Sequence, residues 1–186
     1  MESAAKIKET LQAASTEKLP EFIAEYETDP RSGVQKLVAS ARKKLDALEK
    51  EKQRIENLKR YEREYAQYSY ICGIDEVGRG PLAGPVVAGA VILPKDCHIL
   101  YINDSKQLSE KKREELYDVI TREAVAWAVG YASPKRIDEI NILQATYEAM
   151  REAIGKLTPA PDLLLNDAVT IPGVNIRQVP IIKGDA

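Results

Sequence analysis

The sequence has few of the side chains that bind transition metals or act as nucleophiles. It contains one histidine, His98, and two cysteines, Cys72 and Cys97, among 186 residues. These numbers exclude a His-rich or four-cysteine zinc site and a disulfide framework. A Ser-His-Asp triad would have to use His98, which lies in the predicted loop PKDCHIL with no serine elbow nearby, so we interpret it as an ordinary loop residue. An enzyme built from this chain would depend on carboxylates.

Long apolar runs are also missing. None approaches the roughly 20 residues that span a bilayer. The N-terminal stretch MESAAKIKETLQAAS carries charged and polar residues where a secretory signal needs an apolar core. The net charge of −2, from 27 Lys+Arg and 29 Asp+Glu, favours no class of partner by itself. We therefore expect a cytoplasmic protein without membrane association.

Residues 1–66 are predicted to form a helical extension, with breaks at Pro20 and Pro30. Asp29 is expected to cap a long helix that continues to Tyr65. Apolar residues recur along this helix at helical spacing: Val34, Leu37, Val38, Ala41, Leu45, Leu48 and Ile55. We expect this stripe to pack on the main domain. Because acidic and basic residues are interleaved on the other faces, a basic arm that touches a nucleic-acid backbone is left open as the alternative.

From Tyr70 onward the composition changes to short apolar strands alternating with helices. The predicted strands are YICGID, GPVVAGAVIL, AVAWAVGYA, DLLLNDAV and VPIIKGDA. The predicted helices are SEKKREELYDVITREA, capped by Ser109, and IDEINILQATYEAMREAIGKL. A turn is expected around Pro172-Gly173. The order β-β-α-β-α-β-β predicts an α/β fold with a five-stranded sheet.

Acidic residues stand at the ends of three of these strands. Asp75 and Glu76 follow the first, Asp167 ends LLLND, and Asp185 ends VPIIKGD. Neighbouring residues of a strand point to opposite faces, so Asp75 and Glu76 can share a site only if the chain leaves the strand between or just after them. Ligand sites in open α/β sheets lie beyond strand ends, and ligands that are all oxygen select Mg²⁺ or Mn²⁺. This pattern favours a two-metal site for phosphoryl displacement, although a solvated pair of acids at a strand end is the common alternative.

The glycines that follow the acids are a second candidate element. In Gly78-Arg79-Gly80 the missing side chains allow backbone groups to come within hydrogen-bonding distance of a ligand. A ribose 2′-hydroxyl, which both donates and accepts, is the group by which a protein distinguishes RNA from DNA. An isolated G-x-G is more often an ordinary turn.

The stretch DEVGRGPLAGPVVA, from Asp75 to Ala88, resembles the signature of ribonuclease HII, the bacterial type 2 ribonuclease H. The resemblance extends over roughly Tyr70 to Ala186 and includes Asp104-Ser105-Lys106 with Leu108, the helix start IDEIN and the tetrapeptide KGDA. The helical extension is similar to that of the Bacillus-type enzymes. The resemblance implies a ribonuclease H-like mixed sheet flanked by helices, with residues 67–186 as the catalytic domain.

The resemblance also implies roles for individual residues. The catalytic and metal-binding carboxylates would be Asp75, Glu76, Asp167 and Asp185. The substrate-binding residues would be Gly78, Arg79, Gly80, Ser105 and Lys106, with the glycine-arginine-glycine segment at the 2′-hydroxyl and Lys106 on a phosphate. The cofactor would be Mg²⁺ or Mn²⁺. No obligate protein partner is implied, and a monomer is expected.

Three departures from the family pattern stand out. Asn166 replaces the usual aliphatic residue before the third acid and, as a polar side chain, needs a partner. The turn between Asp167 and Asp185 is about one residue longer than usual, a change that loops tolerate. The chain ends at Ala186 where family members continue into further helices, so we expect an incomplete domain with exposed apolar sheet surface.

The resulting hypothesis is an endoribonuclease that cleaves the RNA strand of RNA–DNA hybrids and single ribonucleotides embedded in DNA duplexes. Its alternative is a truncated, catalytically incompetent fragment that still binds nucleic-acid duplexes. A helical interaction module would fit the extension alone.

Overall fold

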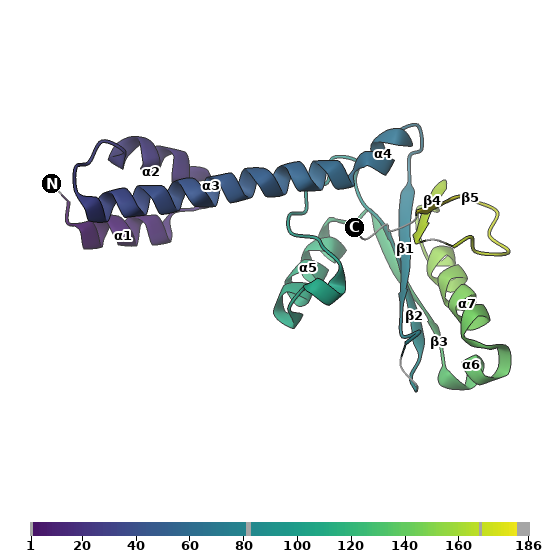
Figure 1. The fold of residues 1–186 in the computed structure, drawn as a ribbon. Coiled ribbons are helices and arrows are strands. Elements are labelled where there is room, and N and C mark those ends of the chain that lie inside the picture. Colours follow the sequence, from purple (N-terminus) through teal and green to yellow (C-terminus); the bar gives the residue numbers. More distant parts are fainter. Residues whose placement is uncertain (1, 81–82, 168, 182–186) are drawn as a thin grey trace. The chain divides into compact units, whose positions relative to one another are not determined.

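The computed structural model describes residues 2–80, 83–167 and 169–181, and the chain separates into two compact units between Leu58 and Lys59 (Figure 1). We call residues 2–58 the helical unit and the described residues from Lys59 onward the sheet unit. The predicted site residue Asp185 lies outside the described residues. In the described part of the chain, no helix combines the length and the apolar character that a bilayer span requires.

The helical unit contains three α-helices and one turn of 3-10 helix. Their bounds are α1 (Ala4–Ala13), η1 (Thr16–Lys18), α2 (Leu19–Tyr26) and α3 (Ser32–Leu58). Pro20 lies in the first turn of α2, where a missing N–H costs no helical hydrogen bond, so it starts a helix rather than breaking one. The three helices enclose a core of eight buried residues: Ile7, Leu11, Leu19, Phe22, Tyr26, Val34, Val38 and Ala41.

The apolar stripe of α3 packs within this unit. Its buried members Val34, Val38 and Ala41 belong to the core shared with α1 and α2, and Leu37 and Leu45 pack at its margin. The predicted packing of this part of the stripe on the main domain is therefore wrong. Two short helices, each too small to be stable alone, take that place because α3 offers them a continuous apolar face.

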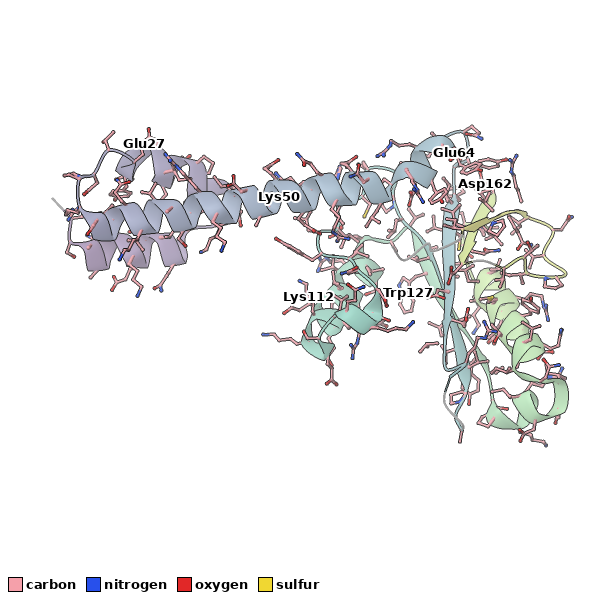
Figure 2. All side chains as sticks on the ribbon, viewed as in Figure 1. Glu27, Lys50, Glu64, Lys112, Trp127 and Asp162 are labelled. Carbon is pink, nitrogen blue, oxygen red and sulfur yellow. The ribbon has the colours of Figure 1, made fainter. Side chains whose placement is uncertain are left out.

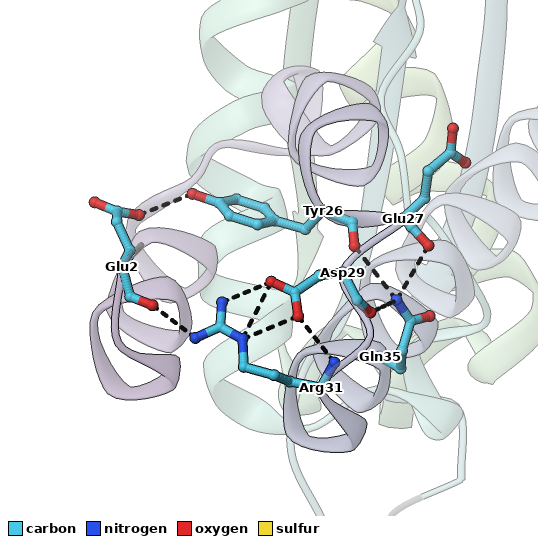
Figure 3. A network of polar contacts seen from close by, with 6 residues as sticks. All are labelled: Glu2, Tyr26, Glu27, Asp29, Arg31 and Gln35. Atoms are coloured by element: carbon cyan, nitrogen blue, oxygen red, sulfur yellow. Dashed lines mark hydrogen bonds and ion pairs between the residues drawn. The ribbon is translucent and has the colours of Figure 1, made fainter.

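The expected helix from Asp29 to Tyr65 is also wrong at both ends. The Asp29 carboxylate, instead of capping the helix, accepts hydrogen bonds from the backbone N–H of Arg31 at 2.9 Å and from its guanidinium at 2.6–3.2 Å (Figure 3). The carbonyl oxygen of Arg31 accepts the first helical bonds, so α3 begins at Ser32. At the other end α3 stops at Leu58, and a separate short helix, α4 (Arg60–Glu64), follows in the sheet unit.

The hydrogen bonds around Asp29 form one polar network, which connects the loop between α2 and α3 with Glu2 near the start of the chain. The Tyr26 hydroxyl donates to Glu2 at 2.9 Å, and Arg31 donates to the carbonyl oxygen of Glu2 at 2.7 Å (Figure 3). The Gln35 amide donates to three carbonyl oxygens of the turn, the shortest bond being 2.6 Å to Asp29. The Arg31 hydrogen bonds lower the pKa of Asp29 to about 2, and the Tyr26 hydroxyl lowers that of Glu2.

We predict that Asp29→Asn removes an acid-sensitive part of the helical unit's stability. A carboxylate whose pKa is lowered by folding stabilises above its unfolded pKa and loses that effect as the pH falls through its folded pKa. Native-state hydrogen exchange of α1 amides should therefore be slower in the wild type than in the variant at pH 6. The difference should shrink below about pH 4, the unfolded value, and disappear near pH 2. A difference that is independent of pH would contradict this assignment.

The sheet unit carries five strands and four α-helices in its described residues (Figure 1). The strands are β1 (Ile71–Val77), β2 (Val86–Ile92), β3 (Ala126–Ala132), β4 (Leu163–Asp167) and β5 (Arg177–Ile181). Besides α4 the helices are α5 (Glu110–Glu123), α6 (Pro134–Ile140) and α7 (Ile142–Gly155), with a 3-10 turn η2 (Ser105–Gln107). The predicted strand order along the chain is confirmed, as is the Ser109 cap, whose hydroxyl accepts the N–H of Lys112 at 3.3 Å.

The second predicted helix of this unit is in fact two. Asn141 has φ +69°, outside the helical region, and its side chain caps α7 by accepting the N–H of Gln144 at 3.1 Å. This non-helical backbone and the side-chain cap together end α6 and begin α7 at one residue. The turn predicted around Pro172-Gly173 is confirmed, with φ +77° at Gly173.

The sheet is mixed, in the order β3-β2-β1-β4-β5. β1 and β3 pair antiparallel with β2, whereas β1 pairs parallel with β4 and β4 with β5. α7 lies along the β1–β3 part of one face (Figure 1). The contact is made by small residues on both sides: Ala145, Ala149 and Ala153 from α7, and Ala88, Ala90, Ala128, Gly130 and Ala132 from the sheet.

The other face of the edge strand β3 is open. Trp127, Val129 and Tyr131 alternate with the buried residues and are 43–54% exposed. Figure 2 shows Trp127 on the side of the sheet away from α7. The ring of Tyr117 from α5 packs edge-on against the Trp127 ring, with the two ring centroids 6.0 Å apart. This face of β3 therefore carries three partly exposed apolar residues.

We predict that Gly130→Ala strongly destabilises the sheet unit. A Cβ at Gly130 would lie 1.8 Å from the carbonyl oxygen of Ala149, so helix and strand would have to separate. Overpacking of this kind costs about 1–3 kcal/mol or more in free energy of unfolding. Urea unfolding followed by Trp127 fluorescence measures it. Gly89→Ala is the matched control, since a Cβ there meets nothing within 4 Å, and it should leave stability unchanged or raise it by up to about 1 kcal/mol.

Candidate functional site

The carboxyl ends of three neighbouring parallel strands meet at one edge of the sheet. The β1–β4 ladder ends at the pair Ile74↔Asn166, so Asp75 and Asp167 are the next residues on two adjacent strands. β4 continues its pairing with β5 to Asp167↔Ile181. The predicted placement of Asp75 and Asp167 at one edge follows from this register, and both residues are exposed.

At its two acidic residues, β1 is paired with β2 but no longer with β4. Its ladder with β4 ends at Ile74, but its ladder with β2 continues through Asp75↔Gly89 and Glu76↔Ala88 to Val77↔Val87. The chain leaves the strand only at Gly78, two residues after Glu76, so both acids lie in regular strand rather than one on each side of a bend. Asp75 is exposed, whereas the Glu76 side chain is 18% exposed.

Local contacts fix the two acids of β1. The Asp75 carboxylate accepts the backbone N–H of Glu76 at 2.7 Å. Oε1 of Glu76 accepts a hydrogen bond from Nη1 of Arg79 at 3.0 Å, which also makes an ion pair. The arginine of the predicted glycine-arginine-glycine segment therefore turns back onto the acid three residues before it.

The two glycines of that segment differ in what they require. Gly78 has φ +98°, and a Cβ on it would lie 2.2 Å from the carbonyl oxygen of Pro85. The turn therefore requires glycine at position 78. A Cβ on Gly80 would meet none of the described atoms within 4 Å, so packing does not explain that glycine.

Ser105 and Lys106 come from a different segment, the turn η2. The Asp104 carboxylate accepts the N–H of Lys106 at 2.9 Å and caps this turn. Arg113 of α5 donates to the carbonyl oxygens of Ser105 at 3.3 Å and of Leu108 at 2.7 Å. The contact of Arg113 with this turn was not predicted from the sequence, because Arg113 is one of many charged residues in an exposed helix.

The described acids fit a hard cation, although they do not complete a site. Asp75, Glu76 and Asp167 offer only oxygen ligands, the type that Mg²⁺ and Mn²⁺ prefer. Among the residues that the structure describes, no three histidine, cysteine or acidic side chains form a group that could hold a metal ion. The fourth predicted ligand, Asp185, lies outside those residues.

Residues 72–183 match the family model described as Ribonuclease HII, and residues 3–66 match the one described as Ribonuclease HII N-terminal domain. The chain belongs to the ribonuclease HII family. The ribonuclease HII of Lachnoclostridium phytofermentans is 66% identical over 161 residues, which are 87% of this chain and 63% of that protein. The ribonuclease HII of Bacillus subtilis is 50% identical over 182 residues, 97% of this chain and 71% of that protein. The chain thus spans about two thirds of the length of these relatives.

A solved structure supports the fold. The ribonuclease H2 of Pyrococcus horikoshii superposes with a TM-score of 0.53 at 25% identity, covering 63% of this chain and 64% of that one. The predicted ribonuclease H-like fold, with a mixed five-stranded sheet and flanking helices, is confirmed, and so is the resemblance to ribonuclease HII of Bacillus type.

In this ribonuclease HII chain the burial of Asn166 is compensated only in part. It is 1% exposed, and its Nδ2 donates to Gln178 at 2.8 Å and to the carbonyl oxygen of Val169 at 3.2 Å. Its Oδ1 is buried without a hydrogen-bond partner among the described residues. The need for a partner was predicted from the sequence; Gln178, twelve residues later, was not.

We predict that Gly78→Ala destabilises the β1–β2 turn and that Gly80→Ala does not. Alanine at a left-handed φ costs about 1–2 kcal/mol, and the clash with Pro85 adds to this cost. Urea unfolding monitored by Trp127 fluorescence should show lower stability for the first variant only. The second should remain within about 0.5 kcal/mol of the wild type. Equal losses in both variants would contradict the distinction drawn between the two glycines.

Proposed function

We propose that the chain is a metal-dependent endoribonuclease that cleaves the RNA strand of RNA–DNA hybrids and single ribonucleotides embedded in DNA duplexes. The observation that carries the proposal is the placement of Asp75 of β1 beside Asp167 of β4, at the carboxyl ends of adjacent parallel strands in a ribonuclease H-like sheet. Membership of the ribonuclease HII family supports it.

The acids would hold the divalent ions. Carboxylates on adjacent strands repel one another when they come close, and a bound cation would lower that repulsion. Asp75, Glu76 and Asp167, with Asp185 as the fourth ligand, are the residues we assign to Mg²⁺ or Mn²⁺. Two such ions would activate the attacking water and stabilise the leaving oxygen of the phosphodiester.

Substrate recognition would fall to the backbone at Gly78–Gly80 and to two exposed residues of η2. The space around Gly80 lets a ribose come close to its backbone, where the 2′-hydroxyl can both donate and accept. Ser105 and Lys106 are exposed, with the carbonyl oxygen of Ser105 bound by Arg113 and the N–H of Lys106 bound by Asp104. We assign both residues to the phosphate backbone, contacts to which position a duplex without reading its sequence. Arg79 is half-exposed and can pass from Glu76 to a phosphate.

Some of the basic side chains of α3 pair with acids of the same helix. Lys52 pairs with Glu49 and Arg54 with Glu51, both at 2.9 Å on α3 itself. These pairs reduce the charge available for a phosphate backbone.

We propose that the chain acts as a monomer. Both cysteines are unpaired, as a reducing compartment would have them, so we place its action in the cytoplasm.

A second candidate is a duplex-binding fragment that does no chemistry. It is favoured by one fact: the acids that the structure describes do not form a metal site by themselves. In that case Lys106 and its neighbours would still bind hybrids, with affinity that falls as salt rises.

We expect metal-dependent cutting at a single ribonucleotide in a DNA duplex. Assays with Mg²⁺, Mn²⁺ or chelator should show cleavage with either ion and none with chelator. Asp75→Asn and Asp167→Asn should each lower the rate at least about 100-fold, because each removes a metal ligand. Asp118→Asn, which changes an exposed acid of α5, is the matched control and should cut like the wild type.

Duplex binding separates the two candidates. Salt-dependent binding that survives Asp75→Asn, with no cleavage under any divalent ion, would reject the nuclease for this chain and support the binding fragment. Cutting that persists with chelator would reject the metal assignment.

A further inference from the structure

The segment after Asp167 is held by side chains rather than by a strand or helix. Gln178 of β5 binds both backbone groups of Ile171: its Oε1 accepts the N–H at 2.7 Å and its Nε2 donates to the carbonyl oxygen at 2.9 Å. Only one orientation of the amide satisfies both bonds. Ile171 is 1% exposed, so these bonds replace water that its backbone has lost.

Asn166 completes the arrangement from β4. Its Nδ2 donates to the same Oε1 of Gln178, at 2.8 Å, and to the carbonyl oxygen of Val169, at 3.2 Å. Asn166 immediately precedes Asp167, and Val169 lies two residues after it. The backbone is therefore fixed on both sides of the acid by one pair of amide side chains.

This arrangement has a cost that packing alone would avoid. Oδ1 of Asn166 is buried and has no partner among the described residues. An aliphatic side chain of similar size would fill the same space without this unpartnered oxygen, but it would give up both bonds that Nδ2 donates. The two donor bonds of Asn166 must therefore provide something that core packing does not.

We propose that Asn166 and Gln178 are positioning residues for Asp167. By fixing Val169 and Ile171 relative to β4 and β5, they hold the backbone next to Asp167, which would be a ligand of the metal ion. The inference rests on the proposed function and assigns to this pair the outer support that metal ligands need.

The test is Mn²⁺ affinity, measured by calorimetry or electron paramagnetic resonance on the full 186-residue chain. Asn166→Val should weaken Mn²⁺ binding about 10–100-fold, the usual effect of losing an outer-shell partner. Its thermal midpoint should change little, because removal of the unpartnered oxygen offsets the loss of two hydrogen bonds. Weaker affinity at nearly unchanged stability is what a purely structural residue would not show.

Gln178→Met is the second variant. It should weaken Mn²⁺ binding and also speed hydrogen exchange at the Ile171 amide, which loses its acceptor. Gln67→Met changes an exposed glutamine of the same unit and should alter neither property.

Unchanged Mn²⁺ affinity in folded Asn166→Val and Gln178→Met overturns this inference and leaves the proposed function intact. A lowered thermal midpoint with unchanged affinity does the same, since it assigns the pair a structural role only. A wild-type chain that binds no Mn²⁺ overturns the metal assignment of the proposed function as well, so the two failures are distinguishable.

Discussion

The close approach of α7 to the sheet is the contact on which the sheet unit depends. It requires Gly130, where any side chain would meet the backbone of α7, together with alanines on both elements. Because the backbones come so close, Glu152 of α7 and Lys156, the residue that follows this helix, also reach the free edge of β3. Glu152 accepts the N–H of Tyr131 at 2.9 Å and Lys156 donates to the carbonyl oxygen of Val129 at 2.8 Å. The helix thus covers one face and satisfies an edge that would otherwise be open to pairing with another chain.

The order of strands and helices could be predicted because it depends on local patterns: alternation, helical spacing, the serine cap and the proline-glycine turn. The errors arose where a side chain had two possible partners. Aspartate is a residue type that often caps helices, but Asp29 has an arginine two residues away that offers it stronger charge-assisted bonds. Asn141 lies inside a helical pattern, and only its left-handed backbone divides α6 from α7. The partner of the α3 stripe was missed because an apolar stripe does not specify what covers it.

The site shows the same division. That Asp75 and Asp167 share an edge follows from strand ends and parallel pairing, which sequence patterns indicate well. The continuation of β1 to Val77 could not be foreseen, because the glycines suggested an earlier departure and the ladder with β2 outlasts the one with β4. Gly78 and Gly80 are identical in sequence terms, and only the position of Pro85 shows that the first is required by the turn.

The parallel strands are treated differently at their two ends, and this difference suits a ligand site. At the amino ends, Asp162 accepts the N–H groups of Ser69 and Tyr70 at 2.8 and 2.9 Å, and Arg177 donates to the Tyr68 hydroxyl at 3.1 Å. These bonds tie the starts of β1, β4 and β5 together. At the carboxyl ends the β1–β4 ladder stops one residue before the acids, which leaves their carboxylates exposed. A sheet fixed at one edge can hold the strands in register while the other edge exchanges its contacts for a cation and a phosphate, and such pre-organisation is what metal-dependent chemistry requires.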